Sequence, residues 1–314
     1  MSATGPGLVM GRIVPELPDR PLSLDAGAAA LGGYGPNMRN VLVTGAGSGI
    51  GRATAEAFVA AGDAVVAAMR DPVRSGPVPG ARTLTLDVSD DSSVSVALAG
   101  LAPFDVVVNN AGISRSGPVE TIDLDDARAQ FETNYWGAVR VIRAVLAPMR
   151  ERGSGLIVNV STVGGRTPAR GYHAFYQGSK HALRAMSEAL RWELAPFGVR
   201  VALIEPGFVA TNIFDRGGYR DAPAASPYAA DEAWVRQFFL AGAAAHAIAP
   251  QQVAAQILTI AAQDQPRLHH PVGADAEAGV AAARSLEFEA WYESALARVE
   301  ALAGPRPQPD TTRE

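Results

Sequence analysis

Short apolar segments alternate along this chain with segments in which apolar residues recur at helical spacing. The apolar segments have the length of strands and lie at residues 40–44, 64–69, 82–86, 104–109, 155–160 and 199–204. The clearest predicted helix runs from about 175 to 196 and carries Leu183, Leu190 and Leu194 on one face. Near-continuous apolar strands that alternate with helices are typical of a parallel sheet buried on both faces. The pattern therefore predicts a single doubly wound α/β domain.

The two ends of the chain lie outside this alternation. Residues 1–37 are rich in Gly, Pro and Ala without any period, which predicts a flexible leader. Near the other end we expect an edge strand within 266–273, an amphipathic helix over about 277–303 and a disordered Pro-rich tail. The expected organisation is the leader, an α/β domain over 38–275, and a C-terminal helix with its tail over 276–314.

A glycine-rich segment joins the first predicted strand to the first predicted helix. It reads Thr-Gly-Ala-Gly-Ser-Gly-Ile-Gly. Such a turn exposes backbone N–H groups and the positive end of a helix, which together bind a pyrophosphate. Placed after the first strand, it predicts a Rossmann-type dinucleotide site formed by Gly45, Ser48, Gly49, Ile50 and Gly51.

The end of the second predicted strand bears on which dinucleotide is preferred. An enzyme that uses NAD usually has an acidic residue there, which binds the ribose 2′-hydroxyl. This chain has Met69 and then Arg70, whose guanidinium suits a 2′-phosphate. Asp71 comes one position later and is expected to be a turn residue before Pro72. We therefore predict NADP (NADPH) as the preferred cofactor, and NAD if Arg70 is only a solvated strand end.

Polar residues follow another predicted strand and interrupt one predicted helix. Asn110, Ala111 and Gly112 follow the fourth apolar segment, at the edge where open α/β sheets bind ligands. Asn134 lies inside a helical region over about 124–152, although Asn is a poor helix former. A residue that contradicts local preference is either part of a functional site or an exposed position on the solvent face.

Two hydroxyl residues, Ser161 and Thr162, end the fifth predicted strand. Either could hydrogen-bond a carbonyl oxygen, but neighbours in a strand point to opposite sides. Only one of the two hydroxyls should therefore face the site.

Tyr176 and Lys180 are one helical turn apart at the start of the long helix over 175–196. A tyrosine normally titrates near pH ~10, which is too high for proton transfer at neutral pH. A neighbouring ammonium favours the phenolate, so we expect Lys180 to lower the pKa of Tyr176. The pair is interpreted as a proton donor and acceptor, although this spacing also occurs by chance on many helices.

Composition excludes several other classes of function. The formal net charge is −5 without a basic block, so no nucleic acid or membrane partner is expected. The absence of cysteine removes disulfides and thiolate chemistry. His269 and His270 point to opposite faces of a strand, and we predict no metal site. No secretory signal or membrane-spanning segment is visible, so we expect a soluble cytoplasmic protein.

Taken together, these motifs resemble the short-chain dehydrogenase/reductase family over about residues 39–275. The resemblance is carried by the glycine turn, Asp87-Val88, the Asn-Asn-Ala-Gly segment that ends at Gly112, Asn134, Tyr176-x-x-x-Lys180, Pro206-Gly207 and Thr211. The glycine spacing is similar to that of the main reductase branch, and Leu268 to Asp275 weakly resembles hydroxysteroid and retinol dehydrogenase-like members. The resemblance implies a homodimer or homotetramer joined through the helices over 124–152 and 175–196.

The resemblance also implies roles for the matching residues. Tyr176 would be the general acid in reduction and the base in oxidation, Lys180 would hold the nicotinamide ribose, and Asn134 would anchor a water. The remaining cofactor contacts would come from Asp87 and Val88 at the adenine, Asn110, Ala111 and Gly112 along the cofactor, and Pro206, Gly207, Val209 and Thr211 at the nicotinamide end. The family usually has Ser-Ser where this chain has Ser161-Thr162, so Thr162 takes the catalytic position and Ser161 is the alternative.

The implied activity is reversible, NADP(H)-dependent reduction of a ketone or aldehyde. A segment over about 207–245 would cover the substrate, and its aromatic residues suggest a small, fairly apolar substrate unless they simply belong to the core: Phe208, Phe214, Trp234, Phe238 and Phe239. One alternative is a carrier-bound acyl or polyketide substrate whose phosphate meets Arg166 and Arg170. Another is a cofactor-sensing scaffold without catalysis, although such a protein need not keep Asn134, Tyr176 and Lys180.

Overall fold

The computed structural model describes residues 38–101, 103–213 and 226–308. These residues belong to one α/β unit. The leader over 1–37, Phe214 and the last residues of the tail lie outside the described part, so the predictions made for them stay predictions.

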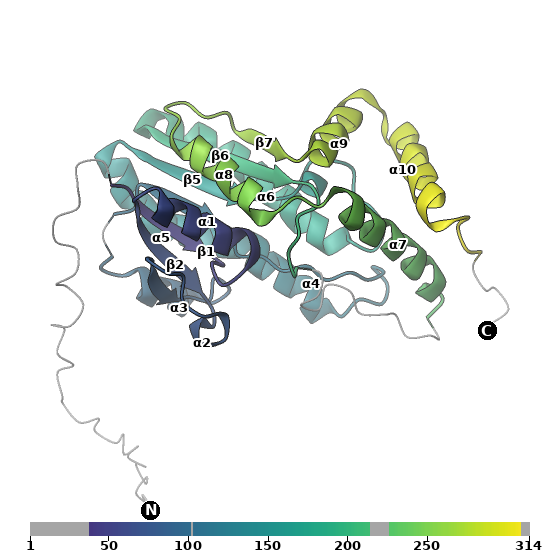
Figure 1. Ribbon diagram of the computed structural model, residues 1–314, viewed down its shortest axis with the longest axis horizontal. Helices are drawn as coiled ribbons and strands as arrows, with labels where there is room; N and C mark the ends of the chain where they lie inside the picture. The colour runs from purple at the N-terminus through teal and green to yellow at the C-terminus, as the bar shows by residue number, and fades with distance from the viewer. Residues whose placement is uncertain (1–37, 102, 214–225, 309–314) are drawn as a thin grey trace, which may run out of the picture. The chain divides into compact units, whose positions relative to one another are not determined.

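A parallel sheet forms the centre of this unit (Figure 1). Its strands are β1 (Asn40–Thr44), β2 (Ala64–Met69), β3 (Arg82–Thr85), β4 (Val106–Asn109), β5 (Gly155–Val160), β6 (Val199–Pro206) and β7 (His269–Val272). They pair in the order β3-β2-β1-β4-β5-β6-β7, and every pairing is parallel. The order reverses between β1 and β4, so the chain leaves these neighbouring strands in opposite directions and opens a crevice at their carboxyl ends. The predicted doubly wound Rossmann-type fold is confirmed.

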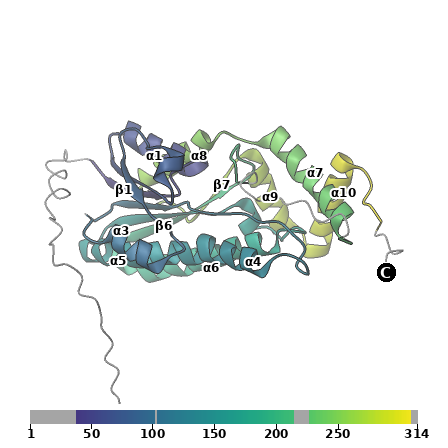
Figure 2. The ribbon, with the colours of Figure 1, turned by 90° about the horizontal axis from the view of Figure 1, so that it is seen from below.

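Helices cover both faces of the sheet (Figure 2). On one face lie α1 (Gly49–Ala60) and α8 (Pro250–Ala261), and on the other α3 (Asp91–Leu98), α5 (Gly137–Arg152) and α6 (Ala174–Leu194). Alternate strand residues enter the two cores: Val41 and Val43 pack toward α1, whereas Leu42 packs toward α5. Burying each such side chain contributes roughly 1.5–3 kcal/mol, which explains why the strands are apolar on both faces.

The remaining elements gather around the carboxyl ends of the strands or join the covering helices. They are α2 (Pro72–Ser75), α4 (Leu124–Phe131), the π-helix η3 (Glu132–Trp136), η4 (Val163–Gly165), η5 (Ala195–Phe197), α7 (Ala229–His246), α9 (Ala274–Ser285) and α10 (Phe288–Ala303). Figures 1 and 2 both place α7, α9 and α10 beyond one edge of the sheet, next to one another.

The prediction of one helix over about 277–303 is wrong, because α9 and α10 are separate helices. Leu286 and Glu287 have extended backbone angles between them. The hydroxyl of Ser285 bonds back to the carbonyl oxygens of Ala281 and Ala282 at the end of α9. The break turns the chain so that α10 packs against α7. Apolar periodicity continues across this break, so the sequence pattern alone did not reveal it.

An ion pair fastens the opposite, amino end of the sheet. Arg39, just before β1, bonds to Asp63 at 2.6 Å, and its other nitrogen donates to the carbonyl oxygen of Ala261 at 3.1 Å. The side chain of Asp63 is only 4% exposed. This contact joins β1, the α1–β2 connection and the end of α8, far along the strands from the crevice.

Candidate active site

In the glycine turn, the backbone after β1 packs directly against the backbone after β4. Gly45 has φ +66°, and a Cβ there would lie 2.8 Å from the Cα of Ala111. A Cβ at Gly51 would lie 2.4 Å from both the side-chain nitrogen of Asn110 and the carbonyl oxygen of Gly45. Neither position accepts a side chain, so β1 and the segment after β4 can approach closely only with glycine at both positions.

Thr44 and Asn110 lock this arrangement. The Thr44 hydroxyl accepts hydrogen bonds from the backbone nitrogens of Asn110 at 3.0 Å and Ala111 at 3.2 Å. The Asn110 side chain donates to the carbonyl oxygens of Thr44 and Gly45. Sequence reasoning assigned no role to Thr44, although it is the first residue of the glycine motif.

The start of α1 fits a pyrophosphate. Its first turn contains no acidic residue, and Ser48 precedes it in an extended conformation without a side-chain cap. The N-terminal N–H groups and the helix dipole are therefore left to an anion. The cradle that glycine keeps free of side chains gives that anion room, so the residues present fit a dinucleotide.

Arg70 lies exposed at the end of β2, beside this cradle. It takes part in no ion pair within the part of the chain that the structure describes. Asp71 is the N-cap of α2 and accepts a hydrogen bond from the Arg74 backbone at 3.0 Å. The expectation that Asp71 is a turn residue is therefore met, which leaves Arg70 as the strand-end side chain.

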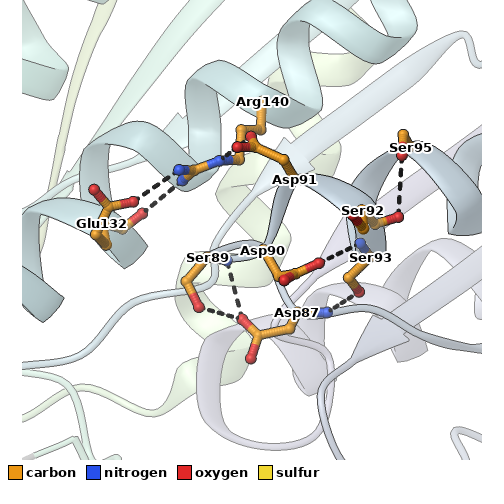
Figure 3. Close-up of polar contacts among 9 residues, drawn as sticks. All are labelled: Asp87, Ser89, Asp90, Asp91, Ser92, Ser93, Ser95, Glu132 and Arg140. Carbon is orange, nitrogen blue, oxygen red and sulfur yellow. Dashed lines mark hydrogen bonds and ion pairs between the residues drawn. The ribbon is translucent and has the colours of Figure 1, made fainter. Parts of the chain in front are cut away.

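Asp87 and Val88 follow β3 at the next connection. Figure 3 shows the polar contacts of Asp87 there. A carboxylate oxygen of Asp87 accepts from the Ser89 backbone at 3.0 Å and from the Ser89 hydroxyl at 2.6 Å. Val88 is buried against Gly137 of α5. Its side chain belongs to the core, so a contact with an adenine would have to use its backbone. Arg140 reinforces this region by bonding to Asp91 at 2.6 Å and Glu132 at 2.8 Å.

Asn134 is buried in the π-helix that interrupts the predicted 124–152 helix. Its side chain accepts from the Ile113 nitrogen at 2.8 Å and donates to the Ile113 oxygen at 2.9 Å and the Ser179 hydroxyl at 3.0 Å. The alternative of an exposed Asn on the solvent face is therefore wrong. A π-bulge that carries a buried polar residue is frequent at functional sites.

Thr162, Tyr176 and Lys180 meet on one wall of a cavity. The Thr162 hydroxyl lies near enough to the Tyr176 phenol to lower its pKa. Lys180 is 4% exposed and donates to the Val160 carbonyl oxygen at 2.9 Å. The Ser161 hydroxyl is buried without a hydrogen-bond partner among the described residues. The geometry thus favours Thr162 over Ser161 as the hydroxyl beside the tyrosine.

Burial controls the proton affinities of this pair. It raises the pKa of Tyr176 to about 12, and the nearby Thr162 hydroxyl offsets this only in part. Burial also lowers the pKa of Lys180 to about 8. Desolvation of the phenolate therefore outweighs the effect of Thr162, and the expected lowering of the Tyr176 pKa by Lys180 stays a prediction.

The cavity has a volume of about 700 Å³. We call the part of the cavity next to the glycine turn, lined by Ile50, Asn110 and Gly112, the cofactor side, and the part lined by Phe208, Phe238, Phe239, Trp291 and Leu302 the substrate side. Pro206, Gly207, Val209 and Thr211 lie along the wall between them. Trp291 and Leu302 belong to α10, a helix that the sequence pattern did not connect to the site.

Trp234 does not line this cavity, contrary to expectation. It is buried between α7 and the residues after α10, where its indole nitrogen donates to the Gly304 carbonyl oxygen at 2.8 Å. Arg306 lies over the Trp234 ring and bonds to Asp231 at 2.7 Å. Trp234 on α7 therefore holds the residues that follow α10.

The alternative of a carrier-bound substrate requires Arg166 and Arg170 to bind its phosphate. Arg166 is instead paired with the buried Glu205 at 2.7 Å and is only 11% exposed. Arg170 lines the cavity, but its guanidinium lies over the rings of Phe238 and Trp291. With Arg166 engaged inside the protein, that alternative loses one of its two phosphate contacts.

The other expectations concern metals and membranes. His269 contacts Glu205 and His270 contacts the Arg267 carbonyl oxygen, which agrees with a structural role for both. Within residues 38–101, 103–213 and 226–308, the structure contains no group of three potential ligands that could hold a metal ion. No helix in those ranges is both long and apolar enough to cross a bilayer.

Comparison with known proteins identifies the family. The sequence profile described as short chain dehydrogenase matches residues 39–222. The chain is 36% identical to oxidoreductase BOA17 of Botryotinia fuckeliana over 269 residues, which is 81% of this chain and 97% of that protein. It is 31% identical to 3-ketodihydrosphingosine reductase of Bacteroides thetaiotaomicron over 74% of this chain and 87% of that one. The chain belongs to the short-chain dehydrogenase/reductase family.

Solved structures agree with this assignment. A short-chain dehydrogenase from Streptomyces avermitilis superposes with a TM-score of 0.71 at 33% identity, covering 85% of this chain and 98% of that chain. A short chain dehydrogenase from Burkholderia cenocepacia, solved in complex with NADP, gives a TM-score of 0.66 at 26% identity, covering 83% and 97%. The protein is thus an oxidoreductase of a family that binds NAD or NADP and acts on small molecules.

Proposed function

We propose that this enzyme reduces a ketone or aldehyde to an alcohol with NADPH, reversibly. The observation that carries the proposal is the meeting of Thr162, Tyr176 and Lys180 on a cavity that also reaches the glycine turn. The nicotinamide, when bound, supplies the hydride. Tyr176 gives its proton to the carbonyl oxygen of the substrate, and the Thr162 hydroxyl donates a hydrogen bond to the same oxygen.

The other site residues position these groups. The glycine turn would hold the pyrophosphate, and Arg70 the 2′-phosphate. Lys180 would contact the ribose as a cation. Asn134, through its bonds to Ile113 and Ser179, keeps the main chain after β4 next to the catalytic helix.

The cavity lining supports an apolar substrate. Aromatic rings and aliphatic side chains make up much of its substrate side, and burying apolar substituents of a substrate against them is favourable. One relative carries the name 3-ketodihydrosphingosine reductase, which describes reduction of a ketone. A ketone or aldehyde with apolar substituents therefore fits best.

The cofactor proposal is tested by titrating the protein with NADPH and NADH, using fluorescence or calorimetry. We expect tighter binding of NADPH, and loss of that preference in Arg70→Asp. Arg82→Asp is the matched control, because Arg82 is equally exposed at the start of the neighbouring strand β3. Tighter NADH binding by the wild type would overturn the NADP assignment and direct the search to alcohol oxidation with NAD.

We also propose self-association as a homodimer or homotetramer through the helices over 124–152 and 175–196. Large apolar side chains are exposed there, including Trp192 at 85% and Trp136 at 46%. Light scattering on the purified protein tests this, and a monomer at micromolar concentration would contradict it.

A further inference from the structure

A short loop presents the hydroxyl of Thr162 to the site and continues directly into Arg166. The backbone nitrogen of Gly164 donates to the Thr162 hydroxyl at 3.3 Å, and that of Gly165 donates to the Thr162 carbonyl oxygen at 2.9 Å. A Cβ at Gly165 would lie 3.0 Å from the Cβ of Lys180. The loop is therefore closely packed against the catalytic helix, and a small shift of the loop would move the Thr162 hydroxyl.

A second segment contacts the same hydroxyl from β6. The Thr162 hydroxyl donates to the carbonyl oxygen of Pro206 at 3.4 Å. The preceding residue is Glu205, whose side chain is only 1% exposed. The position of Thr162 thus depends on how the loop after β5 is held relative to the end of β6.

One ion pair connects these two segments. Arg166 bonds to one carboxylate oxygen of Glu205 at 2.7 Å, and Nδ1 of His269 contacts the other at 3.1 Å. His269 continues to Glu188 on α6 at 3.3 Å. A buried carboxylate is costly unless it is paired, and this one has a partner on each oxygen.

Stability alone does not account for such a pair. A buried ion pair is often no more stabilising than apolar residues of the same size, because desolvation offsets the attraction. The pair does fix the position of one segment relative to the other. Moving the two segments apart would leave each buried charge without its partner, which is strongly unfavourable. Arg39 and Asp63 form a comparable pair at the amino end of the sheet, where no site residue lies.

We propose that Glu205 and Arg166 are positioning residues, which hold the Thr162 loop against the end of β6 so that the Thr162 hydroxyl stays beside Tyr176. The proposed role of Glu205 and Arg166 rests on the proposed carbonyl reduction, because it is measured mainly through the kcat of that reaction. A displacement near 1 Å at a catalytic group can reduce the rate by about 100-fold. We expect that order of loss in kcat, with little change in NADPH affinity.

The experiment compares Arg166→Met, Glu205→Gln, the double variant and Arg39→Met. Both single variants at the site should lose stability and kcat together, because each leaves a charge unpaired. The double variant removes both charges and should recover the thermal unfolding midpoint, whereas kcat should stay low because the loop is no longer tied. Arg39→Met should lower the unfolding midpoint and leave kcat unchanged.

Recovery of wild-type kcat in the double variant would overturn the inference. The ion pair would then only neutralise a buried charge and would not position Thr162. A kcat of Arg166→Met no lower than that of Arg39→Met would overturn it as well. A crystal structure of Arg166→Met gives a readout that does not need turnover: a Thr162 hydroxyl that still contacts the Pro206 carbonyl oxygen and lies beside Tyr176 as before would contradict positioning. Absence of turnover by the wild type on any carbonyl would instead refute the proposed function.

Discussion

The cofactor side and the substrate side of the cavity are built in different ways. On the cofactor side, main chain lies against main chain, and Gly45 and Gly51 have no room for a methyl group. On the substrate side, the wall consists of side chains such as Phe238, Phe239 and Leu302 from helices far apart in the sequence. The first arrangement suits a ligand common to a whole family, and the second can change with each substrate.

The difference teaches where variation is tolerated. Backbone packing accepts no added atoms, so a substitution there acts on binding and on stability together. Side chains on a cavity wall can be exchanged with a change in fit alone. Tyr176 lies where the cofactor side and the substrate side of the cavity meet. Variants at Tyr176 and on each of the two sides therefore test the comparison.

The largest effect is expected at the meeting point, from Tyr176→Phe. Removing the phenolic hydroxyl removes the proton donor, and kcat should fall by about 10²–10⁴-fold. NADPH affinity should be unchanged, because the ring remains in place. Steady-state kinetics and a binding titration measure the two quantities, and turnover near the wild-type rate would refute the mechanism.

On the cofactor side, Gly51→Ala should lower NADPH affinity by about tenfold or more. Its Cβ would lie 2.4 Å from Asn110 and Gly45, and overpacking of this kind costs about 1–3 kcal/mol. The control is Gly171→Ala, because a Cβ at Gly171 would meet nothing within 4 Å. Equal NADPH affinities in the two variants, measured by fluorescence titration, would show that the glycine turn can accept a methyl group at position 51 without loss of binding.

On the substrate side, Phe238→Leu should raise KM for an apolar ketone by about fivefold and leave NADPH binding intact. The expected loss is roughly 1 kcal/mol of apolar contact. Phe288→Leu on α10 is the matched control, since Phe288 is 55% exposed and does not line the cavity. A changed NADPH affinity in Phe238→Leu would mean that the two sides are coupled.

The smallest effect is a pH dependence. Burial lowers the pKa of Lys180 to about 8, so its charge is present below that pH and is lost as the pH rises. Reduction should therefore be fastest below about pH 8 and decline above it. His173, which also lines the cavity, has its pKa lowered by burial to about 4 and stays neutral over this range. A rate that is constant up to pH 10 would contradict the role of Lys180.

Much of the cofactor side could be predicted because its signals are local. The glycine turn, Asn110 and Asn134 each contradict ordinary strand or helix preferences within a few residues of sequence. The choice between Ser161 and Thr162 could not be made that way, because it depends on the Tyr176 hydroxyl across the loop. The break between α9 and α10 was missed because the apolar spacing continues through it.

The sequence by itself determined the doubly wound sheet, the family and the dinucleotide cradle, because alternation, periodicity and glycine spacing act through neighbouring residues. Only the tertiary structure showed that the Thr162 hydroxyl lies beside Tyr176, that Arg166 pairs with Glu205, and that α10 forms part of the cavity wall. It also showed that burial raises the pKa of Tyr176. Each of these depends on burial and on contacts between distant segments, which spacing along the chain does not encode.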